Sequence, residues 1–283
     1  INVNGISTQF LPLTSTSKAL PNKIRILGQQ SDAKGIDIAG YSETSLDWNA
    51  PNVRHQFQTH IQDYSPGTVF AESSSRIHYD SSWQPGGSCT TASRQWSTRV
   101  VDRHYDKYGR WSGLSLKGKE GFCCHIFTLY NATVNDPTKG VRTNNAQLRA
   151  MYLAEGRPNI DAPSNFSSDL IALIRPLLSP TSGVIVLGDF NLNLRDPRVR
   201  LGNSLHELGL VDVHRHKFPD LIPVKTCSRG SQQIDYIYST ANLIPFVQSA
   251  GIEAFHDHID SDHRGMFVDI NLGQFLRGQP PQL

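Results

Sequence analysis

The sequence predicts a layered α/β fold, and three features support this class. A run of four aliphatic residues, Val184 to Leu187, is mostly β-branched and is typical of a strand covered on both faces. Segments with helical periodicity are interspersed with strand-like segments, and a hairpin signal occupies the middle of the chain. This order favours a layered arrangement over a simple parallel Rossmann sheet.

The first half of the chain contains a segment with helical spacing and several strand-like segments. Residues 18–32 have apolar side chains at helical spacing, and 36–44 is a short strand that ends in Glu43. Residues 65–100 are rich in Ser, Gly and Pro, as expected for strands joined by loops. In 111–130, the apolar stretches WSGLSL and FCCHIFTLY flank the turn sequence KGKEG, which predicts a hairpin.

The second half repeats the mixture of helices and strands. Helical periodicity marks 144–156 and 166–178, on either side of a polar segment. Residues 203–213 are expected to form a short helix and a turn, whereas 232–240 and 264–272 have the alternation of strands.

Length and composition fit one domain. The chain has 283 residues, of which 38% are hydrophobic, which suffices for a core and excludes a disordered chain. We place this domain at 1–273 and interpret the Pro-rich segment 274–283 as a tail or linker. The formal net charge of +2 permits a polyanionic partner without arguing for one. No apolar run is long enough to span a bilayer, so no membrane partner is expected.

The cysteines suggest a reduced protein. The adjacent pair Cys123 and Cys124 lies in a strand-like stretch, so one of the two side chains is expected in the core. Cys89 and Cys227 stand alone, and no CxxC pair occurs, which argues against a structural zinc site. Buried, reduced cysteines in an intracellular protein are the simplest interpretation.

Acidic residues stand at the ends of strand-like segments. Glu43, Asp189 and Asp262 each follow such a segment, Asp235 lies inside one, and His263 follows Asp262. Taken singly, each has an ordinary alternative as a helix cap, a loop hydrogen bond or a solvated side chain. If the strand ends converge, however, carboxylates and amides would meet, and these suit Mg²⁺ or Mn²⁺ better than zinc. A metal, a water-activating carboxylate and a cationic imidazole together suit phosphodiester hydrolysis.

Six short motifs occur in an order that resembles a known superfamily. They are NVNG (2–5), SET (42–44), LYNAT (129–133), GDFNLN (188–193), IDYIY (234–238) and SDH (261–263). This order resembles the endonuclease/exonuclease/phosphatase superfamily, which includes DNase I and the apurinic endonucleases, over nearly the whole chain. The NVNG start, the PGG turn at 85–87 and GRWSGLSLKGK at 109–119 are most similar to the endonuclease domains of non-LTR retrotransposon polyproteins.

The resemblance implies a fold and an activity. The fold would be a four-layer α/β-sandwich of the DNase I-like type, with two packed mixed β-sheets flanked by helices. The activity would be that of a divalent-metal-dependent phosphodiesterase that nicks DNA and leaves a 3′-hydroxyl for target-primed reverse transcription. The implied cofactor is Mg²⁺, with Mn²⁺ as an alternative, and no small-molecule cofactor is expected. The implied partners are DNA and a reverse transcriptase domain in the same polyprotein.

The resemblance also implies the ligands of the metal. Glu43 corresponds to the main metal ligand, and Asn2 to a residue that positions metal and phosphate. Asn4 stands where apurinic endonucleases carry an aspartate near the metal, and Asp262 is expected to reach the same ion. Ser42 departs from the family, which often has Gln before this Glu.

Five further positions correspond to the catalytic set. Asp189 would activate the attacking water, and Asn191 would orient it. His263 would stabilise the phosphate as a cation, while Asp235 would orient His263 or help the leaving group. Tyr130 would contact the scissile phosphate.

DNA contacts are expected beside this set. Thr226 corresponds to a residue near the phosphate in retrotransposon relatives. Arg195, Arg198 and Arg200 follow the GDFN motif and are predicted to contact flanking phosphates, with a solvated surface as the alternative.

Two other functions stay open at this stage. One is another phosphoesterase activity on the same fold, with an inositol phosphate, sphingomyelin or RNA as substrate. The other is a catalytically decayed, nucleic-acid-binding copy, for which the departures at Asn4, Ser42 and Ala132 leave room. The chain begins at Ile1, which fits a domain cut from a longer polyprotein, and we expect an intracellular, nuclear location.

Overall fold

Helices and strands alternate along the chain in the computed structural model, which describes Ile6 and residues 23–75, 84–133, 143–157, 162–257 and 261–281. The helices are α1 (Lys23–Ala33), α2 (Pro51–Gln62), α3 (Asn144–Ala154), α4 (Ala162–Ile174), α5 (Arg200–Glu207), α6 (Val213–Lys217) and α7 (Leu272–Phe275), with 3₁₀ turns at Arg94–Arg99, Arg175–Leu177 and Ala241–Phe246. The strands are β1 (Ile38–Ser42), β2 (Val69–Ser73), β3 (Ser88–Ala92), β4 (Val100–Tyr105), β5 (Trp111–Lys117), β6 (Cys123–Tyr130), β7 (Ser182–Asp189), β8 (Leu210–Asp212), β9 (Asp235–Thr240), β10 (Val247–Ile252) and β11 (Met266–Ile270).

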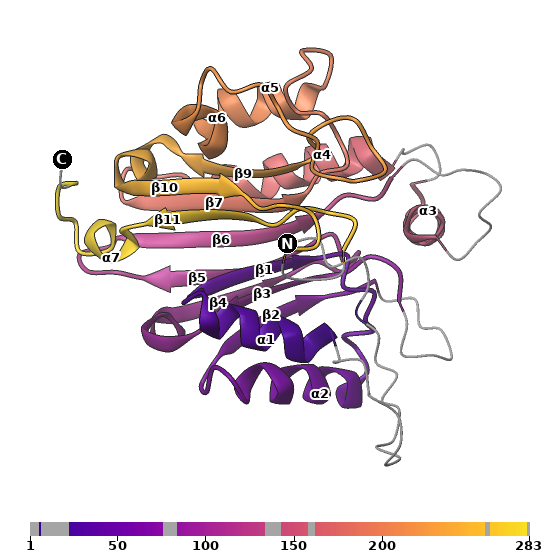
Figure 1. Ribbon diagram of the computed structural model, residues 1–283. Coiled ribbons are helices and arrows are strands. Elements are labelled where there is room, and N and C mark those ends of the chain that lie inside the picture. Colours follow the sequence, from indigo (N-terminus) through magenta and orange to yellow (C-terminus); the bar gives the residue numbers. More distant parts are fainter. Residues whose placement is uncertain are drawn as a thin grey trace.

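Two sheets face each other in the middle of the molecule (Figure 1). The larger has the strand order β4-β5-β6-β7-β9-β8, in which β6 and β7 are parallel and the other neighbours antiparallel. The smaller has the order β1-β3-β2 and is antiparallel, and β10 pairs with β11 in a separate ladder. The predicted sandwich is therefore confirmed, although parallel pairing within the described ranges is confined to the larger sheet.

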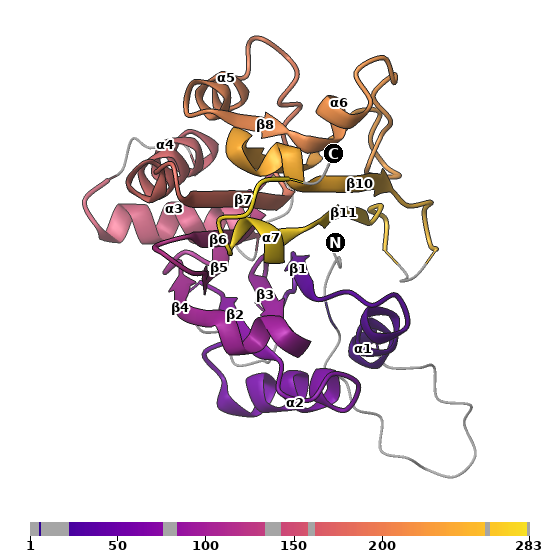
Figure 2. The same cartoon turned by 90° about the vertical axis from the view of Figure 1, so that its left-hand side faces the viewer.

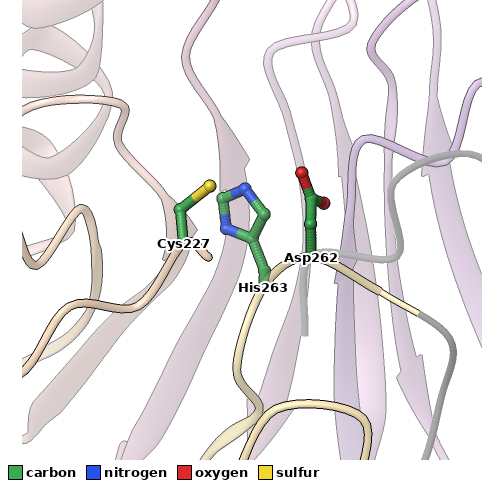
Figure 3. Close-up of side chains that lie close together, drawn as sticks. All are labelled: Cys227, Asp262 and His263. Carbon is green, nitrogen blue, oxygen red and sulfur yellow. The ribbon is translucent and has the colours of Figure 1, made fainter. Parts of the chain in front are cut away.

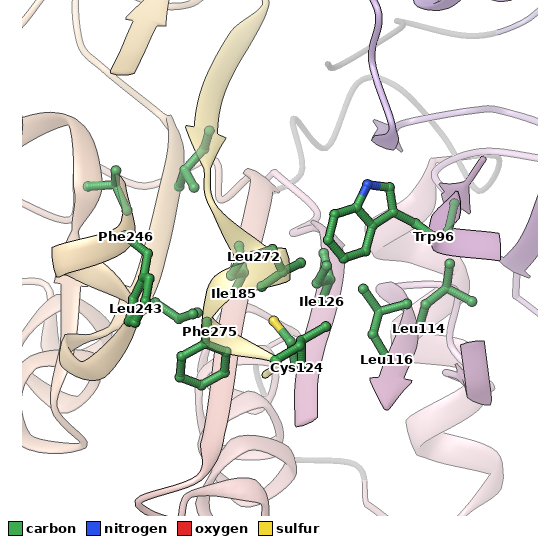
Figure 4. Close-up of a cluster of buried hydrophobic side chains, with 14 of the residues drawn as sticks. Trp96, Leu114, Leu116, Cys124, Ile126, Ile185, Leu243, Phe246, Leu272 and Phe275 are labelled. Atoms are coloured by element: carbon green, nitrogen blue, oxygen red, sulfur yellow. The ribbon is translucent and has the colours of Figure 1, made fainter. Parts of the chain in front are cut away.

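The side chains of β7 alternate between the two faces of the larger sheet. Ile185 lies in the core between the sheets, together with Cys124 from β6 and Leu114 from β5 (Figure 4). Val184 and Val186 lie on the opposite face, in a second core. Both faces of β7 are covered, which explains its unbroken aliphatic run. The burial of Cys124 confirms that one of the paired cysteines lies in the core.

Helices cover the outer face of each sheet. On the smaller sheet, α1 and α2 pack their apolar side chains against β1, β2 and β3 in a cluster that includes Leu27 and Phe57 (Figure 2). On the larger sheet, α4 and α5 contribute Phe166, Leu170 and Leu205 to the second core. None of the helices in the described ranges is long and apolar enough to cross a membrane.

The C-terminal part of the fold departs from the sequence-based expectation in two respects. The strand β10 was not predicted, because its sequence VQSAGI is only half-buried and lacks a clear apolar pattern. Phe275 and Leu276, which were assigned to the polar tail, are buried in the core between the sheets. The packed part of the chain thus extends to Leu276, because Phe275 at the end of α7 and the following Leu276 pack into the core between the sheets.

Gly188 supplies a testable constraint on this fold. Its φ is +133°, and a Cβ built there would lie 2.2 Å from the Leu129 carbonyl oxygen on the neighbouring strand. We expect Gly188→Ala to lower the free energy of unfolding by at least about 1–3 kcal/mol from backbone strain alone. The urea midpoint of the variant measures this loss. Gly230→Ala is the matched control, since its nearest neighbours lie 3.8 Å away, and an equal midpoint in both variants would contradict the interpretation.

Candidate active site

The register of three strands places a row of polar side chains side by side. Tyr130 at the end of β6 is paired with Asp189 at the end of β7, and Asp189 is paired with Asp235 at the start of β9. Each lies an even number of residues along its strand from a residue of the core between the sheets, such as Ile185 on β7. Side chains at even spacing on a strand point to the same face of the sheet. The row therefore belongs to the face between the sheets, and all three residues are buried.

His263 joins this row from the loop before β11. Its Nδ1 lies 2.9 Å from Oδ2 of Asp235, and both side chains are 6% exposed. Burial lowers the pKa of His263, but the hydrogen bond to Asp235 and the charges of Asp235 and Asp189 outweigh it and raise the pKa to about 9. The imidazole is therefore a cation at neutral pH, as predicted for a phosphate-stabilising histidine.

The loop after β7 holds Asp189 in a defined orientation. The backbone N–H of Asn191 donates to Oδ1 of Asp189 at 2.8 Å, and the Asn191 amide donates to Oδ2 at 3.1 Å. The same amide also donates to the Asn131 carbonyl oxygen at 2.6 Å, and the Asn131 side chain donates to the Phe190 carbonyl oxygen at 2.9 Å. These bonds allow the left-handed backbone of Asn191, at φ +49°, which an asparagine tolerates better than most residues.

Glu43 reaches the row from the smaller sheet. It follows β1 with a left-handed φ of +53°, and its side chain accepts a hydrogen bond from Tyr130. Burial first, and then the charges of Glu43 and Asp189, raise the pKa of Tyr130, so the phenol stays protonated. Ser42 does not take part, because its buried hydroxyl donates to the Leu129 carbonyl oxygen at 2.7 Å.

The site gathers several carboxyl groups around one imidazolium. Burial raises the pKa of Asp189 well above its ordinary value, and the charge of Asp235 raises it further, while His263 and the N–H of Asn191 act in the opposite direction. The Asp189, Asp235 and His263 side chains offer ligand atoms within 4.8 Å of one another. A cation bound beside these carboxyl groups and Glu43 would lower the cost of ionising them, so the site suits a further cation.

The donor atoms fit a hard divalent cation. Asp262 has one oxygen, Oδ2, 2.5 Å from Nη2 of Arg229, whereas its Oδ1 is buried and has no hydrogen-bond partner. A buried carboxylate oxygen without a partner is costly unless something else binds it. The carboxylate oxygens of Asp262, beside His263, and of Glu43, beside Tyr130, are of the type that Mg²⁺ prefers. The other two predicted metal residues, Asn2 and Asn4, lie outside the described residues.

Thr226 lies beside the row but does not face outward. It is fully buried, and its hydroxyl oxygen accepts hydrogen bonds from the backbone N–H groups of Ile234 at 3.0 Å and Asp235 at 3.1 Å. The structure thus places Thr226 where it anchors the start of β9 and, through it, Asp235.

The three predicted DNA-binding arginines differ in their surroundings. Arg195 is half-buried and pairs with the buried Asp212 at 3.1 Å, so its charge is already neutralised locally. Arg198 is 88% exposed and pairs with Asp196 at 2.6 Å in a surface contact of little energetic weight. Arg200 is exposed at the start of α5.

The structure adds residues that the sequence analysis did not assign. Asn131 organises the Asp189 loop, and its position directly after Tyr130 in the LYNAT motif was the available signal. Arg229 neutralises one oxygen of Asp262, and Cys227 lies close to both Asp262 and His263. No signal for Arg229 or Cys227 existed in the sequence, because these contacts depend on how two loops meet.

The position of Thr226 can be tested by removing its hydroxyl. We expect Thr226→Val to lower the free energy of unfolding by about 1–3 kcal/mol for each backbone N–H left without an acceptor. Thr226→Ser keeps the oxygen and should stay close to the wild type. Urea unfolding of both variants measures the difference. A valine variant of wild-type stability that binds DNA less tightly would instead favour a direct phosphate contact.

Comparisons with known proteins agree with this geometry. No family model and no curated protein sequence matches the chain. Among solved structures, an endonuclease/exonuclease/phosphatase family protein from Leptotrichia buccalis is 15% identical, with coverage of 96% of this chain and 97% of that chain and a TM-score of 0.56. The AP endonuclease LMAP from Leishmania major is 14% identical, with coverage of 85% and 80% and a TM-score of 0.64.

A third similar structure is a retrotransposon domain. The endonuclease domain of TRAS1, a telomere-specific non-LTR retrotransposon, is 16% identical, with coverage of 89% of this chain and 93% of that chain and a TM-score of 0.52. Similarity to solved structures at this level of sequence identity establishes the fold of the chain but not its activity. The chain therefore has the DNase I-like α/β-sandwich fold of the endonuclease/exonuclease/phosphatase proteins, and it resembles the retrotransposon endonuclease domain in that fold.

Proposed function

We propose that this chain is a divalent-metal-dependent phosphodiesterase that nicks DNA. The observation that carries the proposal is the buried row of Asp189 and Asp235 with the imidazolium of His263, at one edge of the sandwich. This row combines a carboxylate base with a cation for a phosphate oxygen, which are the groups that phosphodiester hydrolysis needs. The fold adds support, since AP endonuclease LMAP and the TRAS1 endonuclease domain share it.

Each residue then has one role in the reaction. Asp189 takes a proton from the water that attacks phosphorus, and Asn191 orients this water, because the two side chains are already hydrogen-bonded to each other. His263 donates its Nε2–H to a phosphate oxygen and stabilises the charge that develops there. Asp235 fixes the imidazole through Nδ1, and Tyr130 contacts the scissile phosphate.

Glu43 and Asp262 would hold the metal, with Asn2 and Asn4 as further ligands. When bound, Mg²⁺ or Mn²⁺ supplies a Lewis acid that polarises the phosphate. The buried, unpartnered Oδ1 of Asp262 and the cluster of carboxyl groups around Asp189 support this assignment. Hydrolysis in which the 3′-oxygen leaves produces a 3′-hydroxyl.

The biological setting belongs to the same proposal. A 3′-hydroxyl end is a primer, so a nick of this polarity suits target-primed synthesis by a reverse transcriptase in the same polyprotein. The motifs shared with retrotransposon endonucleases and the fold shared with the TRAS1 domain support this setting. Chromosomal DNA would then be the target, and the nucleus the place of action.

Nicking of a supercoiled plasmid tests the activity. We expect Mg²⁺ to support conversion to open circles and EDTA to abolish it. Asp189→Ala should lower the rate roughly 10²–10⁴-fold because the general base is lost. His263→Ala should lower it roughly 10²–10³-fold because one oxyanion donor is lost. His216→Ala, an exposed histidine on α6, is the matched control and should keep wild-type rates.

Other results would redirect the proposal. A folded wild-type protein that leaves the plasmid intact would overturn DNA nicking, and the same variants would then be assayed on inositol phosphates, sphingomyelin and RNA. Binding of DNA without turnover in any of these assays would indicate a decayed copy.

The pH profile tests the pairing of Asp235 and His263. Because His263 acts as a cation, kcat/KM should fall as the pH rises through its pKa of about 9. Asp235→Asn removes the charge that raises the pKa of both His263 and Asp189. The rise of kcat/KM as Asp189 ionises and its fall as His263 loses its proton should therefore both move to lower pH. The measurement is kcat/KM for nicking between about pH 5 and 10. Asp63→Asn, exposed at the end of α2, should leave the profile in place.

Salt dependence tests the arginines that follow the GDFN motif. We expect Arg198→Ala and Arg200→Ala each to weaken DNA binding and to reduce the slope of log K against log salt by about 1, as for the loss of one phosphate contact. Arg195→Ala should mainly lower stability, because it leaves the buried Asp212 without its partner. Binding isotherms at several salt concentrations measure the slopes. Equal slopes in the wild type and the first two variants would support the solvated-surface alternative.

A further inference from the structure

Cys227 brings a soft ligand to the edge of the candidate active site. Its backbone forms an isolated antiparallel bridge with His263, which aligns two loops that are far apart in the sequence. The thiol of Cys227, a nitrogen of His263 and a carboxylate oxygen of Asp262 all lie within 4.8 Å of one another. Figure 3 shows the imidazole between the thiol and the carboxylate.

We propose that Cys227, Asp262 and His263 form a binding site for Zn²⁺, and that zinc bound there inhibits the phosphodiesterase. The inhibitory part rests on the proposed function, whereas the metal site itself does not. A thiolate, an imidazole and a carboxylate are ordinary zinc ligands, whereas Mg²⁺ prefers oxygen ligands throughout.

Each of the three ligands has a free atom for the metal. His263 uses Nδ1 for Asp235, which leaves Nε2. Asp262 uses Oδ2 for Arg229, which leaves the buried Oδ1 that has no hydrogen-bond partner. The Cys227 side chain belongs to a half-buried residue without a disulfide, so it is accessible to an ion.

The spacing requires only a small adjustment. Ligand atoms around tetrahedral zinc lie roughly 3.3–3.8 Å apart, given bonds of about 2.0–2.3 Å. The present separations of at most 4.8 Å can reach this range by rotation of the Cys227 and Asp262 side chains, while Asp235 holds the His263 ring. With water as the fourth ligand, the three residues complete an open tetrahedral site.

The hydrogen bond between Asp235 and His263 already has the form found behind metal-bound histidines. Such histidines commonly donate their second ring N–H to a carboxylate, which fixes the tautomer and the ring orientation. Here Asp235 accepts from Nδ1 at 2.9 Å and thereby aims Nε2 away from itself. The same arrangement that prepares His263 for a phosphate oxygen therefore prepares it for zinc.

Inhibition follows because zinc takes Nε2 of His263 and a carboxylate oxygen of Asp262 from the reaction. Binding of zinc releases the thiol proton of Cys227 and the Nε2 proton of His263, because both ligands coordinate through a lone pair. His263 is then no longer a cation with an N–H for the phosphate. Asp262 is withdrawn from the magnesium ligands at the same time.

Cobalt absorption tests the site without any assay of activity. Co²⁺ is the probe, added to the purified full chain without Mg²⁺, because cobalt–thiolate coordination gives a charge-transfer band in the near ultraviolet. We expect one equivalent of Co²⁺ to give this band, and added Zn²⁺ to remove it. Cys227→Ser should lack the band, whereas Cys123→Ser, which alters another partly exposed cysteine, should retain it.

Nicking assays then test the inhibition. Zn²⁺ should inhibit Mg²⁺-supported nicking by the wild type and Cys123→Ser, and Cys227→Ser should need at least about tenfold more Zn²⁺. Absence of the cobalt band in the wild type, or its persistence in Cys227→Ser, would overturn the zinc site. Equal sensitivity of both cysteine variants to zinc would overturn the inhibitory role. A cobalt band in a protein that never nicks DNA would retain the metal site and reject the proposed function.

Discussion

The pairing of β7 with β6 and β9 is the constraint on which the site depends. Because Tyr130, Asp189 and Asp235 occupy registered positions on neighbouring strands, their side chains meet without any contribution from loop flexibility. A slip of one residue in β7 would turn Asp189 toward the outer core, which is filled by Phe166, Phe190 and other apolar side chains. The cores on both faces therefore specify the site as strongly as they specify the fold.

This row has an electrostatic cost, and the surrounding residues reduce it unequally. Asp235 has a buried cation beside it in His263, and the two charges stabilise each other. The charge of His263 and the hydrogen bond from the Asn191 N–H also favour the ionised form of Asp189, but burial and the charge of Asp235 outweigh them and raise its pKa. The raised pKa of Asp189 suits a residue that exchanges a proton, whereas Asp235 contacts the histidine and fixes its ring.

The sequence predicted what depends on local pattern and missed what depends on contacts between loops. The aliphatic run before Asp189, the hairpin of β5 and β6, and the layered class are encoded in periodicity and turn residues, and the structure confirms them. The assignment of Glu43, Asp189 and His263 to one site came from motif order, because no local pattern indicates which strand ends converge. The buried role of Thr226 and the position of Cys227 depend on the loop before β9, whose path no periodicity predicts.

His263 connects the catalytic and the metal-binding interpretations, since its two nitrogens face different groups. Nδ1 is fixed by Asp235, and that bond raises the pKa of the ring, which makes the protonated form a good partner for a phosphate oxygen. The same bond leaves Nε2 for another partner, and Cys227 and Asp262 offer ligand atoms within 4.8 Å of a nitrogen of this ring, so a metal ion would compete with the proton for Nε2. Because a proton and a zinc ion cannot occupy Nε2 together, zinc must overcome the resistance of the proton that Asp235 stabilises there, even though Asp235 also holds the ring in the orientation that zinc requires. Replacing Asp235 would weaken this resistance and, at the same time, the hold on the ring that zinc requires.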